Sequence, residues 1–145
     1  MKRGVVVIIL LSTVVLLAQT NPTGSSQTGV SKAALERGKK VYATYCLSCH
    51  QADGSGVPKL NPPLIKTTWV LGDKKKLINV VLNGMDELIE IDGEEYENVM
   101  PAQSFLKDDQ IADVLTYVRN SFGNKASVIT AAEVKALRGK AKTAK

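Results

Sequence analysis

The chain has 145 residues, 44% of them hydrophobic and 23% charged, which is the composition of a soluble globular protein with room for one domain. Its two cysteines and one histidine are too few for a four-ligand zinc site or a disulfide framework, and no P-loop motif points to a nucleotide-driven enzyme. The formal net charge is +5, and only 5% of the residues are aromatic, so few large side chains are available for a core.

The first thirty residues are typical of an exported protein. Lys2 and Arg3 precede an uncharged apolar run over residues 4–18, which is shorter than the roughly twenty residues that a bilayer span needs. We therefore predict a secretory signal over residues 1–20, either cleaved or kept as an anchor with membrane association through the apolar run. Residues 21–30 have the composition of a flexible linker. The remainder is expected to work in the periplasm or another exported location.

Residues 31–139 are predicted to form one all-α domain of three to four short helices joined by long loops, followed by a disordered tail over 140–145. Capping residues and apolar periodicity predict helices over residues 32–45, 74–83, 108–122 and 131–138. Residues 51–71 are rich in glycine and proline and are expected to be loop with at most one helical turn. The sequence Asp92-Gly93 favours a type I′ turn in a short hairpin over 88–97.

This set of elements makes a poor hydrophobic core. A few short helices with so few aromatic residues bury little apolar surface by themselves. The pattern therefore indicates that a large apolar group completes the fold.

The sequence Cys46-Leu47-Ser48-Cys49-His50 ends the first predicted helix and supplies such a group. C-x-x-C-H is the attachment signature of c-type haem. Cysteines three apart on a helical turn face the same way, so each can add its sulfur to one haem vinyl group. The next residue, His50, then lies beneath the ring and can offer a nitrogen to the iron.

Two other interpretations of the cysteine pair are weaker. A thiol–disulfide redox pair of the thioredoxin type follows a strand in an α/β fold, whereas this pair follows a helix in an all-α chain. A disulfide between Cys46 and Cys49 would be strained. Attachment of c-type haem outside the cytoplasm also agrees with the predicted export signal.

The sixth ligand of the iron has to be something other than histidine, since His50 is the only one. Outside the predicted export signal there are two methionines, Met85 and Met100. Met100 lies in an irregular stretch before the helix at 108–122, and Pro101 stiffens that stretch by fixing its own φ. We expect Met100 to be the ligand, with Met85 as the alternative; a methionine that only fills the core is the other interpretation.

With these residues in place, the stretch from Ala33 to Arg138 resembles the class I c-type cytochromes, which are small carriers with one covalently attached haem c. The resemblance implies the cytochrome c fold, in which a glycine and an aromatic residue of the first helix cross the last helix. Gly38 and Tyr42 match those positions, with Val114 and Tyr117 opposite them.

The resemblance also implies further cofactor contacts. Pro62, Pro63 and Leu64 match a loop in which a carbonyl orients the proximal histidine, and Met100 with the following proline matches the distal loop. Trp69 resembles an aromatic residue that packs on the haem or holds a propionate, with a plain core tryptophan as the alternative. The acidic segment before Met100 is closer to bacterial cytochromes that serve as subunits or domains of dehydrogenases and copper reductases.

Two filled axial positions, from His50 and Met100, disfavour oxygenase or peroxidase chemistry and favour a fairly high reduction potential. The expected function is therefore a one-electron carrier, not an enzyme, between exported or membrane-bound redox proteins such as a dehydrogenase, a reductase or a terminal oxidase. One alternative is a haem module with a labile or missing sixth ligand that binds a small gas or performs slow peroxidase chemistry. Another is a fixed subunit of a larger dehydrogenase or oxidase.

Charge is segregated along the chain. Residues 31–80 carry nine basic and three acidic side chains, residues 81–113 carry one lysine and ten acids, and residues 114–145 carry seven basic side chains and one acid. This pattern is either ordinary solvated surface or a dipole that orients the haem edge toward a partner. The three lysines at 74–76 are too few, and lack interleaved aromatic residues, for nucleic-acid binding.

Overall fold

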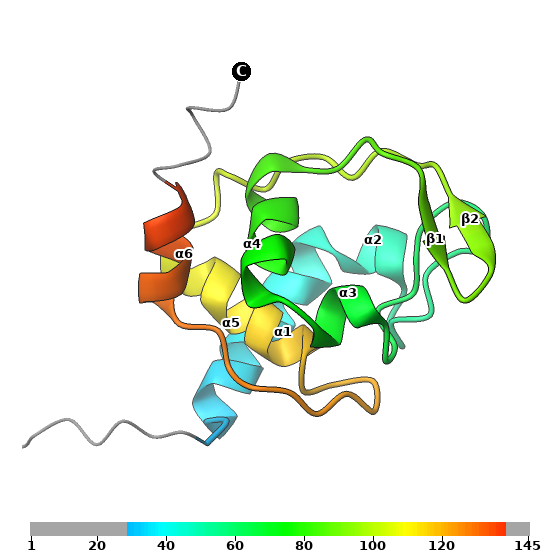
Figure 1. Cartoon of the computed structure of the whole chain (residues 1–145). Coiled ribbons are helices and arrows are strands. Elements are labelled where there is room, and N and C mark those ends of the chain that lie inside the picture. The colour runs from blue at the N-terminus through cyan, green and yellow to red at the C-terminus, as the bar shows by residue number, and fades with distance from the viewer. Residues whose placement is uncertain (1–28, 139–145) are drawn as a thin grey trace, which may run out of the picture.

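The computed structural model describes residues 29–138. The predicted export signal, all but the last two residues of the predicted linker, and the predicted tail lie outside the described residues. The elements in chain order are α1 (Lys32–Tyr45), α2 (Leu47–His50), α3 (Thr68–Leu71), α4 (Lys74–Asn83), β1 (Ile89–Ile91), β2 (Glu94–Tyr96), α5 (Asp108–Val118) and α6 (Ala131–Arg138) (Figure 1).

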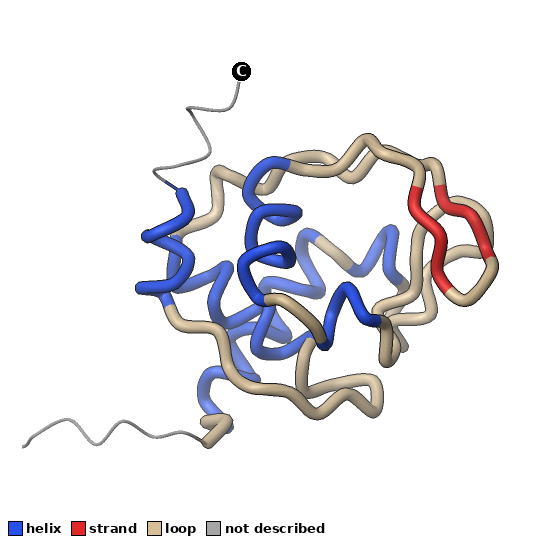
Figure 2. The backbone as a smooth tube through the Cα atoms, in the orientation of Figure 1, coloured by secondary structure: helices blue, strands red, loops and turns tan. Residues whose placement is uncertain are grey.

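The described part of the chain is helix-rich, but the prediction of an all-α fold is incomplete. Strands β1 and β2 form a two-stranded antiparallel sheet with Ile91 opposite Glu94, and they are the hairpin that the Asp92-Gly93 pair predicts. Both turn residues have positive φ, 53° and 82°, as a type I′ turn requires. Two four-residue helices, α2 and α3, add to the four predicted ones, and long loops join them (Figure 2).

Helices α1 and α5 cross at close range. A Cβ on Gly38 would lie 2.1 Å from the carbonyl oxygen of Asp113 and 2.7 Å from Cβ of Tyr117, so a residue without a side chain is needed there. One turn later, the ring of Tyr42 packs against Tyr117 and Phe122, with centroids 5.5 and 5.4 Å apart. The crossing that the resemblance implies is therefore present.

Helix α5 is shorter than its periodicity predicts, because it ends at Val118 and not at Phe122. The side-chain Nδ2 of Asn124 donates to the Val118 carbonyl at 2.8 Å, and Nδ2 of Asn120 donates to the Thr116 carbonyl at 2.9 Å. These side chains satisfy carbonyls of the last turn, and Phe122 then takes a positive φ of 57°. The early end places the Phe122 ring against α1.

On the inner face of α1, Gly38, Val41 and Tyr42 are buried. Tyr45, at the end of the helix, is 43% exposed and packs edge-to-face on Phe105, with ring centroids 5.3 Å apart. An aromatic pair therefore lies on the surface just before the cysteine motif.

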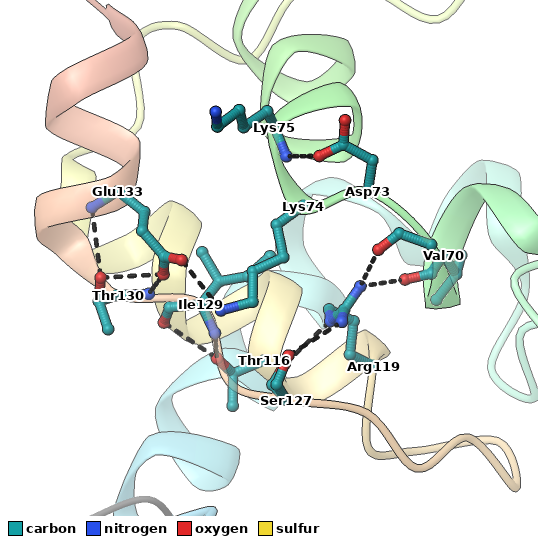
Figure 3. Close-up of polar contacts among 11 residues, drawn as sticks. Val70, Asp73, Lys74, Lys75, Thr116, Arg119, Ser127, Ile129, Thr130 and Glu133 are labelled. Carbon is teal, nitrogen blue, oxygen red and sulfur yellow. Dashed lines mark hydrogen bonds and ion pairs between the residues drawn. The ribbon is translucent and has the colours of Figure 1, made fainter.

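Helices α4 and α6 begin with the predicted caps. The Asp73 carboxylate accepts from the Lys75 N–H at 2.8 Å, and the Thr130 hydroxyl and Glu133 carboxylate form a reciprocal capping box. Glu133 also pairs with the Lys74 ammonium at 2.9 Å, which joins the two helices (Figure 3). Figure 1 shows α6 beside α4 and α5, at the end of the molecule away from the hairpin.

Arg119 lies at the centre of a buried polar network (Figure 3). Arg119 is 2% exposed, and its guanidinium donates to the carbonyls of Val70 and Ser127 at 2.6 and 2.9 Å. The contacts join the end of α3 to the segment between α5 and α6. Burial lowers the pKa of Arg119, partly offset by the negative charge of Glu133.

The core has two parts. The larger lies between α1, α4, α5 and α6, and the smaller consists of Ile89, Ile91 and Tyr96 of the hairpin packed with Trp69 and Met85. Within residues 29–138, none of the helices has the length and apolar character needed to cross a membrane.

Candidate functional site

An apolar cavity, partly open to solvent, lies between the two parts of the core. Its walls come from α1, α4, α5, the hairpin and the loops 51–67 and 97–107. Seven of the eight residues predicted for the site line it: Cys46, His50, Pro62, Pro63, Leu64, Trp69 and Met100. The sequence-based prediction therefore converges on one space in the fold.

The eighth residue, Cys49, lines an adjoining cavity. Cys46, His50, Pro62 and Met100 line both cavities, so the two are parts of one cleft. Two thiols, an imidazole and a thioether therefore surround the same space.

The imidazole of His50 is held in a defined tautomer. Its Nδ1 lies 3.1 Å from the carbonyl oxygen of Pro62, and because a carbonyl can only accept, Nδ1 carries the proton. Burial lowers the pKa of His50, partly offset by this hydrogen bond, so the ring is neutral near pH 7. Nε2 is then left with a free lone pair, which is the state that a metal ligand needs.

The loop 51–67 that carries this carbonyl is tied down at several points. The Tyr42 hydroxyl donates to the Gln51 carbonyl at 2.7 Å, and the Asn124 amide nitrogen donates to the Leu64 carbonyl at 2.9 Å. Val57 and Asn61 exchange two backbone hydrogen bonds of 2.8 Å across the turn before the prolines. The irregular loop is therefore a fixed wall of the cleft, which the sequence alone did not indicate.

No disulfide joins Cys46 to Cys49 in the structure. Burial, with a smaller contribution from Cys49, raises the pKa of the Cys46 thiol to about 11. Redox-active C-x-x-C pairs instead rely on a thiol with a lowered pKa. The chemistry of this pair therefore fits covalent attachment of a group in the cleft better than thiol–disulfide exchange.

Met100 and Met85 lie directly opposite each other on an antiparallel bridge. The Met85 N–H donates to the Met100 carbonyl at 2.9 Å and the Met100 N–H donates to the Met85 carbonyl at 2.8 Å. Gly84, with φ 76°, allows this close approach, because a Cβ there would lie 2.5 Å from the Met100 carbonyl oxygen. Both methionines line the cleft, so both candidates for the sixth ligand stay in place.

Trp69 lies at the edge of the cavity, between the hairpin and α4. Its ring packs with the small core cluster, and the ammonium of Lys76 lies 3.6 Å from the ring centroid. This geometry is a cation–π contact. Trp69 thus combines a cavity-facing position with a positively charged neighbour.

Several cavity residues were missed by the sequence analysis. The hairpin contributes Ile89 and Ile91, whose alternation with Glu90 is the pattern of a half-buried strand. The segment after Met100 contributes Gln103 and Leu106. The acidic hairpin is therefore a wall of the site on its apolar side, a role that its alternation could have revealed.

The chemistry of the cleft fits a largely apolar group that contains a metal. Its wall is mostly apolar, and it presents the thiols of Cys46 and Cys49, Nε2 of His50 and the thioethers of Met100 and Met85. Thiol, imidazole and thioether are the groups that attach and ligate a c-type haem.

Comparison with known proteins gives the class of this protein. The family model for cytochrome c matches residues 35–122, and a cytochrome c-552 of Thermus thermophilus is 38% identical over 112 residues, covering 71% of this chain and 85% of the relative. The chain belongs to the cytochrome c family. It is an electron-transport protein of the class I c-type cytochromes, with covalently bound haem c as its cofactor.

Other relatives are parts of larger proteins. The cytochrome c subunit of a quinone-dependent alcohol dehydrogenase from Gluconacetobacter polyoxogenes is 34% identical over 121 residues, which cover 81% of this chain and 26% of the subunit. A cbb3-type cytochrome c oxidase subunit CcoP from Azospirillum brasilense is 37% identical over 100 residues, which cover 64% of this chain and 30% of the subunit. This chain thus spans about a quarter to a third of those subunits.

Proposed function

We propose that the chain is a one-electron carrier in which Cys46 and Cys49 bind haem c covalently and His50 and Met100 occupy the two axial positions. The observation that carries the proposal is the convergence of the Cys46–His50 motif and of Met100, fifty residues further along the chain, on one cleft. When bound, the haem supplies a ferric–ferrous couple, and a thioether ligand favours the ferrous state.

Residues around the site hold its ligands in position before an electron is transferred. The Pro62 carbonyl fixes the tautomer of His50 and leaves Nε2 free to bind the metal. Pro63, Leu64 and the apolar residues of α4 and the hairpin keep water away from that nitrogen. Trp69, which lines the cavity beneath the Lys76 ammonium, would contact the bound group. A site with fixed ligands needs little rearrangement when one electron is gained or lost.

Electron exchange takes place at the cysteine edge of the cleft. Cys49 is exposed there, and Tyr45 and Val99, which line the same part of the cleft, are 43% and 60% exposed. These side chains give a partner protein an apolar surface close to the site. Lys75 and Lys76 of α4 and the acidic residues Asp86 and Glu87 line one surface pocket together with Trp69 and Met85, and these charges orient the encounter.

The partners are inferred to be redox proteins of the dehydrogenase, reductase or terminal oxidase classes. The names of the relatives, which include subunits of an alcohol dehydrogenase and a cbb3-type oxidase, support this inference. The apolar run at residues 4–18 supports export to the periplasm. A second candidate, also favoured by those names, is a fixed subunit of such an enzyme; it would purify with the enzyme or the membrane fraction, whereas a free carrier would not.

The axial ligation is tested by the weak long-wavelength absorption band that arises from methionine sulfur bound to ferric iron. Met100→Ala is expected to remove this band, because it removes the proposed ligand. Met85→Leu is the matched control, because Met85 lies opposite Met100 on the same bridge, and it is expected to keep the band. Loss of the band in Met85→Leu alone would assign the ligand to Met85. Absence of the band in the unmodified protein would overturn the proposal and favour the gas-binding or peroxidase alternative.

A further inference from the structure

The loop 97–107, which carries Met100, is fastened to α4 on one side. The bridge to Met85 holds the backbone of Met100 itself, and the Gln103 N–H donates to the Val81 carbonyl at 2.8 Å. These contacts fix the first half of the loop. The second half, which leads to α5, needs a separate attachment.

Arg138, the last residue of α6, provides that attachment. Its Nη1 donates to the Ser104 carbonyl and its Nη2 donates to the Leu106 carbonyl, each at 2.6 Å. Its Nε donates to the Asp108 carboxylate, also at 2.6 Å. All three guanidinium nitrogens therefore bind residues 104–108, which form the end of the loop and the first residue of α5, and a planar, charged fork is well suited to hold such a set of acceptors.

The attachment bears directly on the cleft. Leu106, whose carbonyl accepts from Arg138, is 3% exposed and lines the same cavity as Met100. Ser104 lies four residues after Met100, so its position limits how far the loop can move. Opening the loop would break the bonds to Arg138 and also expose Leu106.

Helix α6 can serve as a fixed base for this contact. Val134 on its inner face is fully buried in the larger core cluster. The family match ends at residue 122, before α6 begins, so this helix lies beyond the segment that defines the family here. Arg138 thus reaches the loop from an element that is held independently of it.

We propose that Arg138 is a positioning residue that keeps the Met100 thioether on the iron by holding the loop 97–107 closed. The proposal rests on the proposed function, because it requires Met100 to be the sixth ligand. Arg138 does not touch the cofactor in this account. It lowers the population of an open loop in which the sixth position is free for another ligand.

The test is a titration of the ferric full-length holoprotein with imidazole, which competes with the thioether and abolishes its absorption band. Arg138→Gln is expected to bind imidazole about tenfold more tightly, a change equivalent to about 1.4 kcal/mol in the closed–open equilibrium. Arg138→Lys, which keeps the charge but not the fork, is expected to fall between Arg138→Gln and the parent. The lysine variant also provides the measurement if the glutamine variant does not fold.

Two control variants separate positioning from general stability. Arg37→Gln removes a two-bond pair with Asp113 at 2.6 and 2.9 Å, between α1 and α5 and away from the loop. Glu133→Gln weakens the other end of α6 without touching the loop. Both are expected to lower the free energy of unfolding while leaving the imidazole affinity within about twofold of the parent.

Amide hydrogen exchange gives a second readout. The Leu106 N–H donates to the Gln103 carbonyl at 3.0 Å, and its exchange is expected to accelerate in Arg138→Gln and not in the controls. Unchanged imidazole affinity and unchanged exchange, with the sulfur band present in the parent, would overturn this inference alone. A parent without the band would overturn His50/Met100 ligation, and this inference with it.

Discussion

The crossing of α1 and α5 and the cleft beside it differ in what fills them. At the crossing, Gly38 brings two backbones together and the rings of Tyr42, Tyr117 and Phe122 occupy the remaining space. In the cleft, side chains of comparable apolar character line a space that no side chain of the described residues fills. The sequence therefore encodes one half of its core in full and leaves the other half to be completed by the haem.

The largest expected effect comes from removing the group that completes the cleft. The double variant Cys46→Ser/Cys49→Ser, prepared without haem, is expected to lose cooperative melting. A native domain has a net stability of only about 5–15 kcal/mol, and without haem the apolar cavity walls of this variant stay exposed to water. Partial helix content from α1 and α5 should remain in the far-ultraviolet circular dichroism spectrum. A cooperative melt similar to that of the holoprotein would show that the haem is not needed to complete the core.

The close packing of α1 against α5 is tested by adding a methyl group where there is no space for one. Gly38→Ala would place its methyl group 2.1 Å from the Asp113 carbonyl oxygen, so the helices have to separate, and unfolding of the holoprotein by urea should show a loss of about 3 kcal/mol. Gly29→Ala is the matched control, since a Cβ there meets nothing within 4 Å. Equal effects at the two glycines would contradict the close approach of α1 and α5.

Arg119 links the two halves, since it joins α3 beside the cleft to the segment after α5. Arg119→Met would leave the buried carbonyl of Val70, and with it the carbonyl of Ser127, without its donor, at a cost of about 2 kcal/mol in urea unfolding. Arg37→Met, in an exposed ion pair, is expected to cost much less. If both variants lose the same stability, the buried network does not join the halves.

The smallest effect concerns the pH dependence of the outer contact between α4 and α6. Partial burial alone would raise the pKa of Glu133, but hydrogen bonds from Lys74 and Thr130 outweigh it, and the pKa lies below its usual value of 4.5. Glu133 therefore stabilises the folded state above about pH 4.5, and this contribution disappears as the pH falls through the folded-state pKa. Glu133→Gln should lose under about 1 kcal/mol at neutral pH and approach the parent in acid, whereas a constant difference would exclude the ionic contribution.

The parts of the site that were predictable depend on neighbours in sequence. The positions of Cys46, Cys49 and His50 follow from one helical turn, and the caps of α1, α4 and α6 follow from residues three or fewer positions away. The hairpin turn is similarly local, because its two central residues set its geometry.

The parts that were not predictable depend on side chains that return from distant segments. Which carbonyl orients His50 is decided by the path of the loop 51–67, and Asn124 fastens that loop from 60 positions beyond Leu64. The same asparagine ends α5 early, against the apolar periodicity. Arg138 likewise reaches the loop 97–107 only in the folded chain.

The central claim, a closed site with a protein ligand on each face of the haem, is tested most directly by adding carbon monoxide to the reduced holoprotein. The account predicts a sharp low-spin ferrous spectrum that carbon monoxide leaves unchanged, because His50 and Met100 occupy both axial positions. A high-spin spectrum that shifts readily with carbon monoxide would contradict it and identify an open haem site.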